Sequence, residues 1–471
     1  MAIPASLLSA IATAGGGQVA LFVGAGCSKE DPTGLPLAGE CAMEAHRQLV
    51  DNNVLAEDEC AEPWDLSALA DLVKSKNGDK QAELVKCLPY KRFKNATANE
   101  GHLIATALLL EGAITNIITL NYDSALSDAL NTLGVEDEIS IVNGPDQHAH
   151  LGRSNVIYLH RSVDNDFEEW ILTSEALEEA WKDAWEETIV RSVITAPVSV
   201  FAGMGSSCGV LRHSTKKIRQ AVGESAQLFV ANPGDASESK FAVELSVKSE
   251  NYVPLKWVDF MRQLGARFHK EVVANLKATC LGFAKREGFV DPVNGKPLDD
   301  IEELTKRVHD LGILGFGAFR GSILLDCRQF PKIENGHVYS IAGLLLAVGC
   351  IERLSNAVGR FGKDGHVVFS VDGRRDVPVL LIDGSTRNLS WLTLENEMRQ
   401  HEDAMSHSFG KKSRRVVAIG VTGTRPENAT PPNSIIGVFD DDDILDGDYS
   451  FQCWDVVQIR EDAGSIERLL G

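Results

Sequence analysis

The chain has 471 residues, of which 44% are hydrophobic and 24% are charged, so it is long enough for about two or three globular domains. Its 46 basic and 67 acidic residues give a formal net charge of −21. This acidity argues against broad binding to nucleic-acid backbones, which needs a basic face. We therefore expect that a partner protein or a local basic patch would carry out any sensing of nucleic acid.

The cysteines and the apolar stretches set expectations about the compartment. The nine cysteines are scattered and form no CxxC pair, which favours reduced thiols and excludes a readable zinc ribbon. The longest apolar stretch, Tyr339 to Ile351, has about 13 residues, fewer than the roughly 20 that cross a bilayer, and is predicted to be a core helix. The N-terminal segment has no basic residue before Lys29, unlike a secretory signal. We expect a cytoplasmic protein without a membrane segment.

The first half of the chain alternates predicted strands with predicted helices. In chain order, apolar runs predict strands at residues 18–24, 116–120, 156–159, 198–202 and 227–231. Helices are predicted at residues 37–50, 66–87 (broken at Asn77-Gly78), 100–111 and 174–194. This pattern indicates an α/β fold with a Rossmann-like, doubly wound parallel sheet covered on both faces. Such sheets bind ligands at the carboxyl ends of their strands.

A change in composition suggests a domain boundary. Residues 233–251 are polar and rich in small side chains, and we place the boundary near residue 255. Beyond it, helices are predicted at residues 256–286 and 299–310, and strands at 367–371 and 416–421. The sequence therefore predicts an N-terminal domain over residues 1–255 and a mixed α/β domain over residues 256–471.

Polar or glycine-rich motifs follow three of the predicted strands. Gly24-Ala25-Gly26-Cys27-Ser28 is either a phosphate cradle, in which backbone N–H groups approach an anion, or a structural tight turn. It lacks the third glycine of GxGxxG, because position 29 is Lys29. The motif Thr119 to Asp123 (TLNYD) can cap a helix or serve a ligand. His160 ends a strand and is either structural or a proton acceptor.

The order of these motifs resembles the sirtuin (SIR2) fold over about residues 10–235. GAGxS is followed by Gly34-Leu35-Pro36, by His102 in a helix, by TxNxD and by a strand that ends in Leu159-His160. Later strands lead into Gly203-Met204-Gly205-Ser206 and into Asn232-Pro233. The resemblance implies an NAD-binding domain in which NAD is the substrate.

The resemblance also implies roles for individual residues. Asn121 and His160 are the expected catalytic residues, with His160 as the base and Asn121 positioning a water or a hydroxyl. The remaining expected contacts to NAD are Gly24, Ala25, Gly26, Ser28, Thr119, Asp123, Gly203, Ser206 and Asn232.

Two departures from the sirtuin pattern bear on the reaction. Deacylase sirtuins carry paired zinc cysteines after the histidine, whereas Arg161 to Val200 contains no cysteine, so no zinc is expected. The family usually has glycine after the histidine, and this chain has Arg161. That side chain can narrow an acyl-lysine channel, contact a phosphate or gate the site.

Zinc-less SIR2-like domains with an added C-terminal domain resemble effectors of bacterial anti-phage systems. The resemblance implies an NAD glycohydrolase that releases nicotinamide and ADP-ribose and depletes NAD on infection. It further implies activation by oligomerisation or by a partner encoded nearby that senses nucleotides or nucleic acid. A non-catalytic NAD-binding or nucleotide-binding scaffold is the alternative, because Arg161 departs from the family pattern.

Three other motifs carry weaker hypotheses. Gly205-Ser206-Ser207-Cys208-Gly209 matches the GxSxG elbow of serine hydrolases, with Ser207 as nucleophile. The carboxylates between Asp440 and Asp448 fit an acidic turn or a docking surface better than a calcium loop. His148 and His150 lack an evident third metal ligand.

Overall fold

A computed structural model describes most of the N-terminal half of the chain and separate segments of the rest. The described residues are 3–12, 19–136, 139–152, 154–178, 185–194, 196–205, 215, 227–286, 302–322, 345–346, 348–349, 351–352, 357–361, 366–370, 377–382, 415–420 and 450–455. The chain divides into two compact units, Met1–Phe268 and His269–Gly471. Each unit is described separately below.

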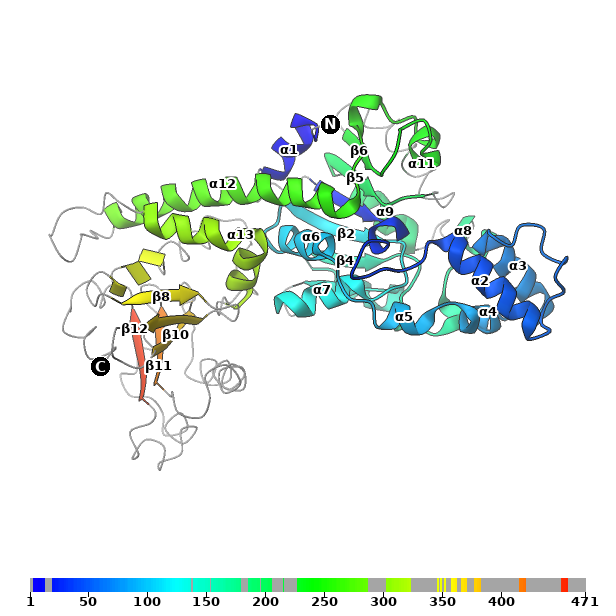
Figure 1. The fold of residues 1–471 in the computed structure, drawn as a ribbon, viewed down its shortest axis with the longest axis horizontal. Coiled ribbons are helices and arrows are strands. Elements are labelled where there is room, and N and C mark those ends of the chain that lie inside the picture. The colour runs from blue at the N-terminus through cyan, green and yellow to red at the C-terminus, as the bar shows by residue number, and fades with distance from the viewer. Residues whose placement is uncertain are drawn as a thin grey trace. The chain divides into compact units, whose positions relative to one another are not determined.

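The first unit is built on a seven-stranded parallel sheet (Figure 1). Its strands are β1 (Val19–Val23), β2 (Ile114–Thr119), β3 (Ser140–Val142), β4 (Asn155–Tyr158), β5 (Val198–Ala202), β6 (Gln227–Ala231) and β7 (Tyr252–Val253). They lie side by side in the order β3-β4-β2-β1-β5-β6-β7. All five residues of β1 and of β5 are buried, as expected for parallel strands covered on both faces. The predicted Rossmann-like parallel sheet is confirmed.

Helices cover both faces of this sheet. Helices α6 (Glu100–Leu110) and α7 (Ala125–Leu133) pack against each other, and α6 also packs against β2. The other face is covered by α9 (Trp185–Ile194) and α11 (Lys240–Glu244). Their apolar side chains join a core cluster with Phe22, Ile118 and Phe201. A short helix, α1 (Ala5–Ala12), precedes β1.

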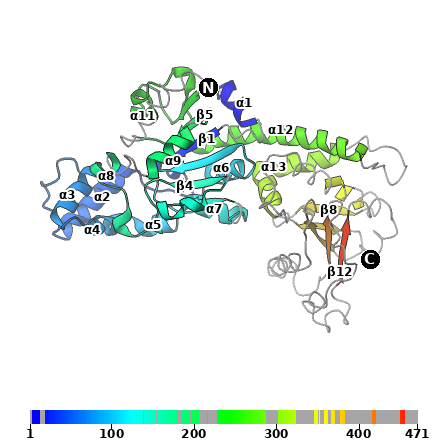
Figure 2. The same ribbon diagram turned by 180° about the vertical axis from the view of Figure 1, so that it is seen from behind.

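A group of helices forms a lobe beside the sheet (Figures 1 and 2). It contains α2 (Ala38–Asp51), α3 (Leu66–Lys76), α4 (Ala82–Cys87), α5 (Tyr90–Lys94) and α8 (Ser174–Glu178). A second core cluster fills it, with Leu49, Leu69 and Leu84 each fully buried. The break predicted at Asn77-Gly78 falls between α3 and α4, where Asn77 is the C-cap of α3. The helix predicted at 174–194 is described as two helices, α8 and α9, with residues 179–184 outside the described residues.

The strand order places a topological switch point at β1. From β1 the chain moves to β2 and β4 on one side and later to β5, β6 and β7 on the other side. Loops after neighbouring strands therefore diverge at the carboxyl ends of β1, β2 and β5. Open α/β sheets bind ligands in the crevice at such a point.

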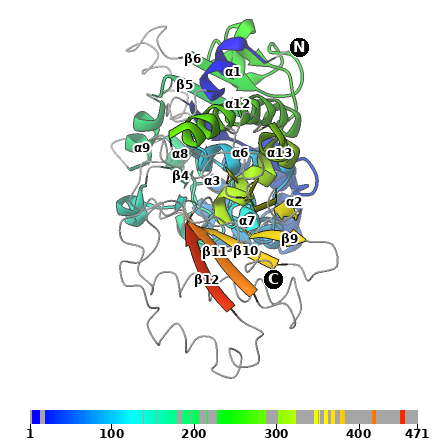
Figure 3. The ribbon, with the colours of Figure 1, turned by 90° about the vertical axis from the view of Figure 1, so that its left-hand side faces the viewer.

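The second unit contains a mixed five-stranded sheet, as Figure 3 shows from the side. Its strands are β8 (Val358–Phe361), β9 (His366–Ser370), β10 (Val377–Ile382), β11 (Arg415–Gly420) and β12 (Ser450–Asp455). Strands β10, β11 and β12 pair in parallel, whereas β8, β9 and β10 pair antiparallel. Helix α13 (Glu302–Ser322) also belongs to this unit, and α12 (Trp257–Arg286) begins in the first unit and ends in the second.

Two observations concern the apolar segments of the chain. The apolar stretch Tyr339 to Ile351 is described only at a few helical positions, among them Leu345 and Leu346, which are buried. Within the described parts of the chain, no helix is long and apolar enough to cross a membrane.

Candidate active site

A cavity of 1480 Å³ opens at the switch point of the first unit. One side, here called the strand-end wall, is formed by residues that follow β1, β2, β4, β5 and β6. These residues are Gly24, Ala25, Gly26, Asn121, His160, Gly203 and Asn232. The opposite side, here called the helical wall, comes from the helical lobe and contains Leu37, Ala38, Gly39, Asp65, Leu66, Ser67, Ser174 and Leu177. The volume exceeds the range of about 300–1,000 Å³ common for small-molecule pockets, so it can hold a ligand with several chemical groups.

The glycines of the strand-end wall allow two loop backbones to touch. A Cβ atom on Gly24 would lie 2.6 Å from the Gly203 carbonyl oxygen, and one on Gly26 would lie 2.8 Å from the Gly203 Cα. The Gly24 N–H donates to the Ala202 carbonyl and the Gly26 N–H to the Gly203 carbonyl, each at 2.9 Å. The expected phosphate cradle is therefore corrected in part, since these two N–H groups serve the contact between loops. Only glycine fits at positions 24 and 26.

Asn121 is held by a buried network that connects three segments. Its Nδ2 donates to the Gly24 carbonyl and to Ser28 Oγ, each at 3.2 Å, and its backbone N–H donates to Thr119 Oγ1 at 3.0 Å. Ser28 Oγ in turn donates to Asp123 Oδ2 at 2.9 Å. Ser28, Thr119 and Asp123 are buried and do not line the cavity, whereas Asn121 does. In this structure these three residues orient Asn121.

Asp123 has two roles in this network. Its Oδ1 accepts from the Ala125 N–H at 3.0 Å at the start of α7, whose N-cap residue is Ser124. Burial raises the pKa of its carboxyl, while hydrogen bonds from Ala125, Ser28 and Asn121 oppose the rise. Asp123 thus accepts hydrogen bonds from Ser28 and from the start of α7, and it does not line the cavity.

His160 follows β4 and lines the cavity, although it is only 8% exposed. Burial lowers the pKa of its imidazole to about 4, with a smaller lowering from the Arg161 charge and an opposing hydrogen bond to the backbone of Leu120. The imidazole is therefore neutral at pH 7 and can accept a proton. The Tyr122 ring, centred 6.2 Å from the His160 ring, stacks on Trp170 at 4.3 Å. This stack borders the histidine with a rigid aromatic surface.

The Arg161 side chain contacts residues of α9. Its guanidinium forms an ion pair with Glu186 of α9 at 2.8 Å, and both side chains are mostly buried. The guanidinium also lies 5.7 Å from the centre of the Trp185 ring. Arg161 has φ of 75°, a left-handed conformation that glycine adopts without strain. The Arg161 side chain therefore occupies a backbone position that favours glycine, and its ion pair connects α9 to the residue that follows His160.

The far end of the strand-end wall is formed by Gly203 and Asn232. Gly203 has φ of 66°, and a Cβ there would lie 2.5 Å from the backbone nitrogen of Cys27. Asn232 connects β6 to the loop after β5: its Oδ1 accepts from the Met204 N–H at 3.1 Å, and its Nδ2 donates to the Met204 carbonyl at 2.8 Å. Ser206, Ser207 and the carboxylates from Asp440 to Asp448 lie outside the described residues.

A comparison with family models matches part of the first unit. Residues 115–253 match the SIR2-like domain family. The matched segment begins at β2 and ends at β7, so it includes Asn121, His160, Gly203 and Asn232. No curated protein matches the chain.

Part of the chain is also similar to solved structures of Sir2 homologues. A Sir2 homologue in complex with NAD is 16% identical and covers 55% of this chain and 91% of its own, with a TM-score of 0.33. A mutant Sir2 homologue in complex with ADP-ribose is 17% identical and covers 57% of this chain and 97% of its own, with a TM-score of 0.33.

Several residues around the cavity were not predicted from the sequence. Tyr122 lines it, and its position between Asn121 and Asp123 was the available signal. Lys256 and Trp257 also line it, although they follow the boundary predicted near residue 255. The helical wall had no sequence signal. His148, considered as a metal ligand, accepts a hydrogen bond from Trp185 Nε1 at 3.1 Å, and the described residues hold no cluster of three metal-ligating side chains.

Proposed function

We propose that the chain is an NAD glycohydrolase that cleaves NAD to nicotinamide and ADP-ribose, with Asn121 and His160 as catalytic residues. The observation that carries the proposal is the pair of strand-end side chains in one cavity at the switch point: a buried, neutral His160 and an oriented Asn121. The match to the SIR2-like domain supports NAD as the ligand.

The proposed reaction breaks the bond between nicotinamide and ribose. The bonding electron pair moves to the pyridinium nitrogen, which becomes neutral, and an oxocarbenium-like ribose forms. A water oxygen bonds to the ribose carbon, and its proton passes to the His160 imidazole and then to solvent. Water that bonds to an oxocarbenium-like carbon becomes strongly acidic, so an imidazole with a pKa lowered to about 4 can still accept its proton. The leaving nicotinamide needs no proton.

Asn121 supplies orientation in this proposal. Its Nδ2 is already engaged by Gly24 and Ser28, so the amide plane is fixed and its Oδ1 can accept a hydrogen bond from water or from a ribose hydroxyl. An amide held in one orientation positions the attacking group without the cost of ordering it at each turnover. Gly203, Asn232 and the Gly24–Gly26 loop then line the remaining length of the dinucleotide.

We further propose that this activity serves as a triggered effector in defence against phage. The support is the resemblance to zinc-less SIR2-like effectors, with no cysteine between Arg161 and Val200. An NAD glycohydrolase that is always active would harm its host. Control by a partner protein or by assembly, through the region after residue 255, is therefore part of the proposal.

Release of nicotinamide tests the proposed reaction. The purified chain, alone and with the products of its neighbouring genes, is incubated with NAD, and nicotinamide and ADP-ribose are quantified by chromatography. We expect equimolar products, at least about 100-fold slower in His160→Ala and Asn121→Ala. His150→Ala, which changes an exposed histidine, is the matched control. Binding of NAD without cleavage in every assembly would contradict the proposal and favour the scaffold alternative.

The defence role needs a separate experiment in cells. Cellular NAD is measured after phage infection of bacteria that carry the chain with its genomic neighbours, or the same genes with His160→Ala. We expect NAD to fall only with the unmodified chain. Equal NAD levels in the two strains after infection would contradict the effector role without touching the reaction itself.

A further inference from the structure

The side chain of Asn99 is a four-way junction behind the glycine loop of the cavity. Asn99 is fully buried and is the N-cap of α6. Its Nδ2 donates to the carbonyls of Cys27 at 2.8 Å and Glu30 at 3.4 Å. Its Oδ1 accepts from the backbone N–H of His102 at 3.2 Å and from Trp257 Nε1 at 3.1 Å. Both donors and both acceptor sites of the amide are used, so its orientation is fixed.

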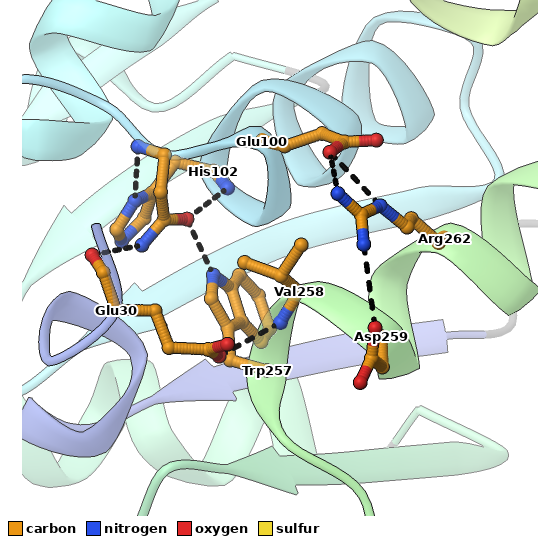
Figure 4. A network of polar contacts seen from close by, with 8 residues as sticks. Glu30, Glu100, His102, Trp257, Val258, Asp259 and Arg262 are labelled. Atoms are coloured by element: carbon orange, nitrogen blue, oxygen red, sulfur yellow. Dashed lines mark hydrogen bonds and ion pairs between the residues drawn. The ribbon is translucent and has the colours of Figure 1, made fainter. Parts of the chain in front are cut away.

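The same loop makes a second contact with the start of α12, shown in Figure 4. The Val258 N–H, in the first turn of α12, donates to Glu30 Oε1 at 3.0 Å. A carboxylate at a helix N-terminus is favourable because it meets free N–H groups and the positive end of the helix dipole. Glu30 and Trp257 both line the cavity. The start of α12 is therefore connected to the Cys27–Glu30 loop in two ways: Trp257 bonds to Asn99, which holds the loop, and Val258 bonds to Glu30 of the loop itself.

The fit of Trp257 against α6 depends on a glycine. A Cβ on Gly101 would lie 2.2 Å from Trp257 Nε1, so only glycine lets the indole reach Asn99. Trp257 is 4% exposed and its ring lies 5.8 Å from that of His102. On the outer side, Arg262 of α12 pairs with Glu100 of α6 (Figure 4). This packing specifies one position for the first turn of α12.

Building on the proposed function, we infer that Asn99 and Trp257 are positioning residues through which α12 sets the conformation of the Cys27–Glu30 loop and hence the affinity for the dinucleotide. Helix α12 continues to Arg286 and so shares its residues between the two units. A partner that displaces α12 breaks the bond from Trp257 to Asn99 and releases the loop carbonyls that Asn99 holds. A partner that binds α12 can in this way change the conformation of the Cys27–Glu30 loop.

Two substitutions remove separately the contact between Trp257 and Asn99 and the contacts between Asn99 and the loop. Trp257→Phe keeps the ring but removes the N–H that donates to Asn99. Asn99→Asp keeps an oxygen that caps α6 but removes the Nδ2 donors to the loop. Matched controls make the same changes at exposed positions, Trp64→Phe and Asn95→Asp.

Hydrogen–deuterium exchange of the full-length chain without ligand tests the coupling directly. We expect both junction variants to speed exchange of the amides in residues 24–30 by roughly three- to tenfold, with β2 and β5 unchanged. In steady-state NAD cleavage we expect a similar rise in KM with kcat within about twofold. Unchanged exchange at 24–30, or equal acceleration throughout the first unit, would overturn the inference. A wild-type chain that releases no nicotinamide contradicts only the proposed reaction, because the exchange measurement contains no NAD.

Discussion

The two walls of the cavity are built in different ways. The strand-end wall consists of loop residues whose backbones touch, with Gly24 and Gly26 bonded to the carbonyls of Ala202 and Gly203. The helical wall presents helix N-termini that are already capped by carboxylates. Glu40 accepts from the Leu37 N–H at 2.7 Å, and Asp65 accepts from the Ser67 N–H at 2.8 Å.

This difference indicates what substitutions in each wall should change. The capped helix ends of the helical wall offer few free N–H groups to an anion, since their N–H groups and positive dipoles already meet carboxylates. The strand-end wall carries the proposed catalytic residues, His160 and Asn121. We infer that substitutions in the strand-end wall change both stability and chemistry, whereas substitutions in the helical wall have smaller, local effects.

The largest effect is expected for Gly203→Ala in the strand-end wall. Gly203 has φ of 66° and lies against Cys27, so an added Cβ meets both backbone strain and a clash. We expect the free energy of unfolding to fall by about 3 kcal/mol or more in urea denaturation. Gly205→Ala is the matched control, because nothing lies within 4 Å of its added Cβ, and it should change stability by less than about 0.5 kcal/mol. Equal losses in the free energy of unfolding for Gly203→Ala and Gly205→Ala would contradict the tight packing proposed at Gly203.

Arg161→Gly tests whether the ion pair or the backbone strain dominates beside His160. Glycine relieves the strain at φ of 75°, but it leaves Glu186, with a side chain 6% exposed, without its cation. We expect a net loss of about 2 kcal/mol in the free energy of unfolding. The double variant Arg161→Gly, Glu186→Gln should recover much of it, because the amide carries no charge. No recovery in the double variant would show that the pair is not what Arg161 contributes.

Stability should also depend on pH through two buried histidines. Burial lowers the pKa of His102 to about 3 and that of His160 to about 4, below the value of about 6.5 in an unfolded chain. As pH falls below about 6.5, the unfolded chain binds protons that the native imidazoles do not, so native stability decreases. We expect a loss of about 2 kcal/mol between pH 7 and pH 5.5, with about half of it absent in His160→Asn. A variant with the same pH slope as the wild type would contradict the assignment to His160.

The smallest effect is expected for the helical wall. Asp65→Ala removes the N-cap of α3, which accepts from the Ser67 and Ala68 N–H groups. We expect a loss of about 1 kcal/mol in the free energy of unfolding, restored by Asp65→Asn, with NAD cleavage within about twofold of wild type. A loss of cleavage as large as that of Asn121→Ala would mean that the helical wall takes part in the chemistry.

The sequence predicted the strand-end wall because local patterns determine it. Residues 198–202 and 227–231 were predicted as strands and form β5 and β6, and motifs directly after strands must gather at one edge of a parallel sheet. Asn121 and His160 were found in this way, whereas Gly203 and Asn232 were implied by the resemblance to the sirtuin fold. All four line one cavity.

Long-range packing explains what the sequence did not predict. Asp71 accepts from the Ser174 N–H across 103 positions, and Trp257 donates to Asn99 across 158 positions. No periodicity or spacing signals such pairs. The sequence likewise left several roles open for Arg161, because its ion pair with Glu186 of α9 is a long-range contact. The helical wall and the α12 junction depend on contacts of this kind.

Calorimetry of NAD binding to His160→Ala, paired with nicotinamide release, tests the central claim most directly. The claim is that the strand-end wall binds NAD through many backbone and side-chain groups, while His160 acts only in cleavage. The account predicts an NAD affinity within about threefold of the wild type and a rate of nicotinamide release at least about 100-fold lower. Undiminished release by His160→Ala, or a wild-type chain that does not bind NAD in any assembly, would contradict it.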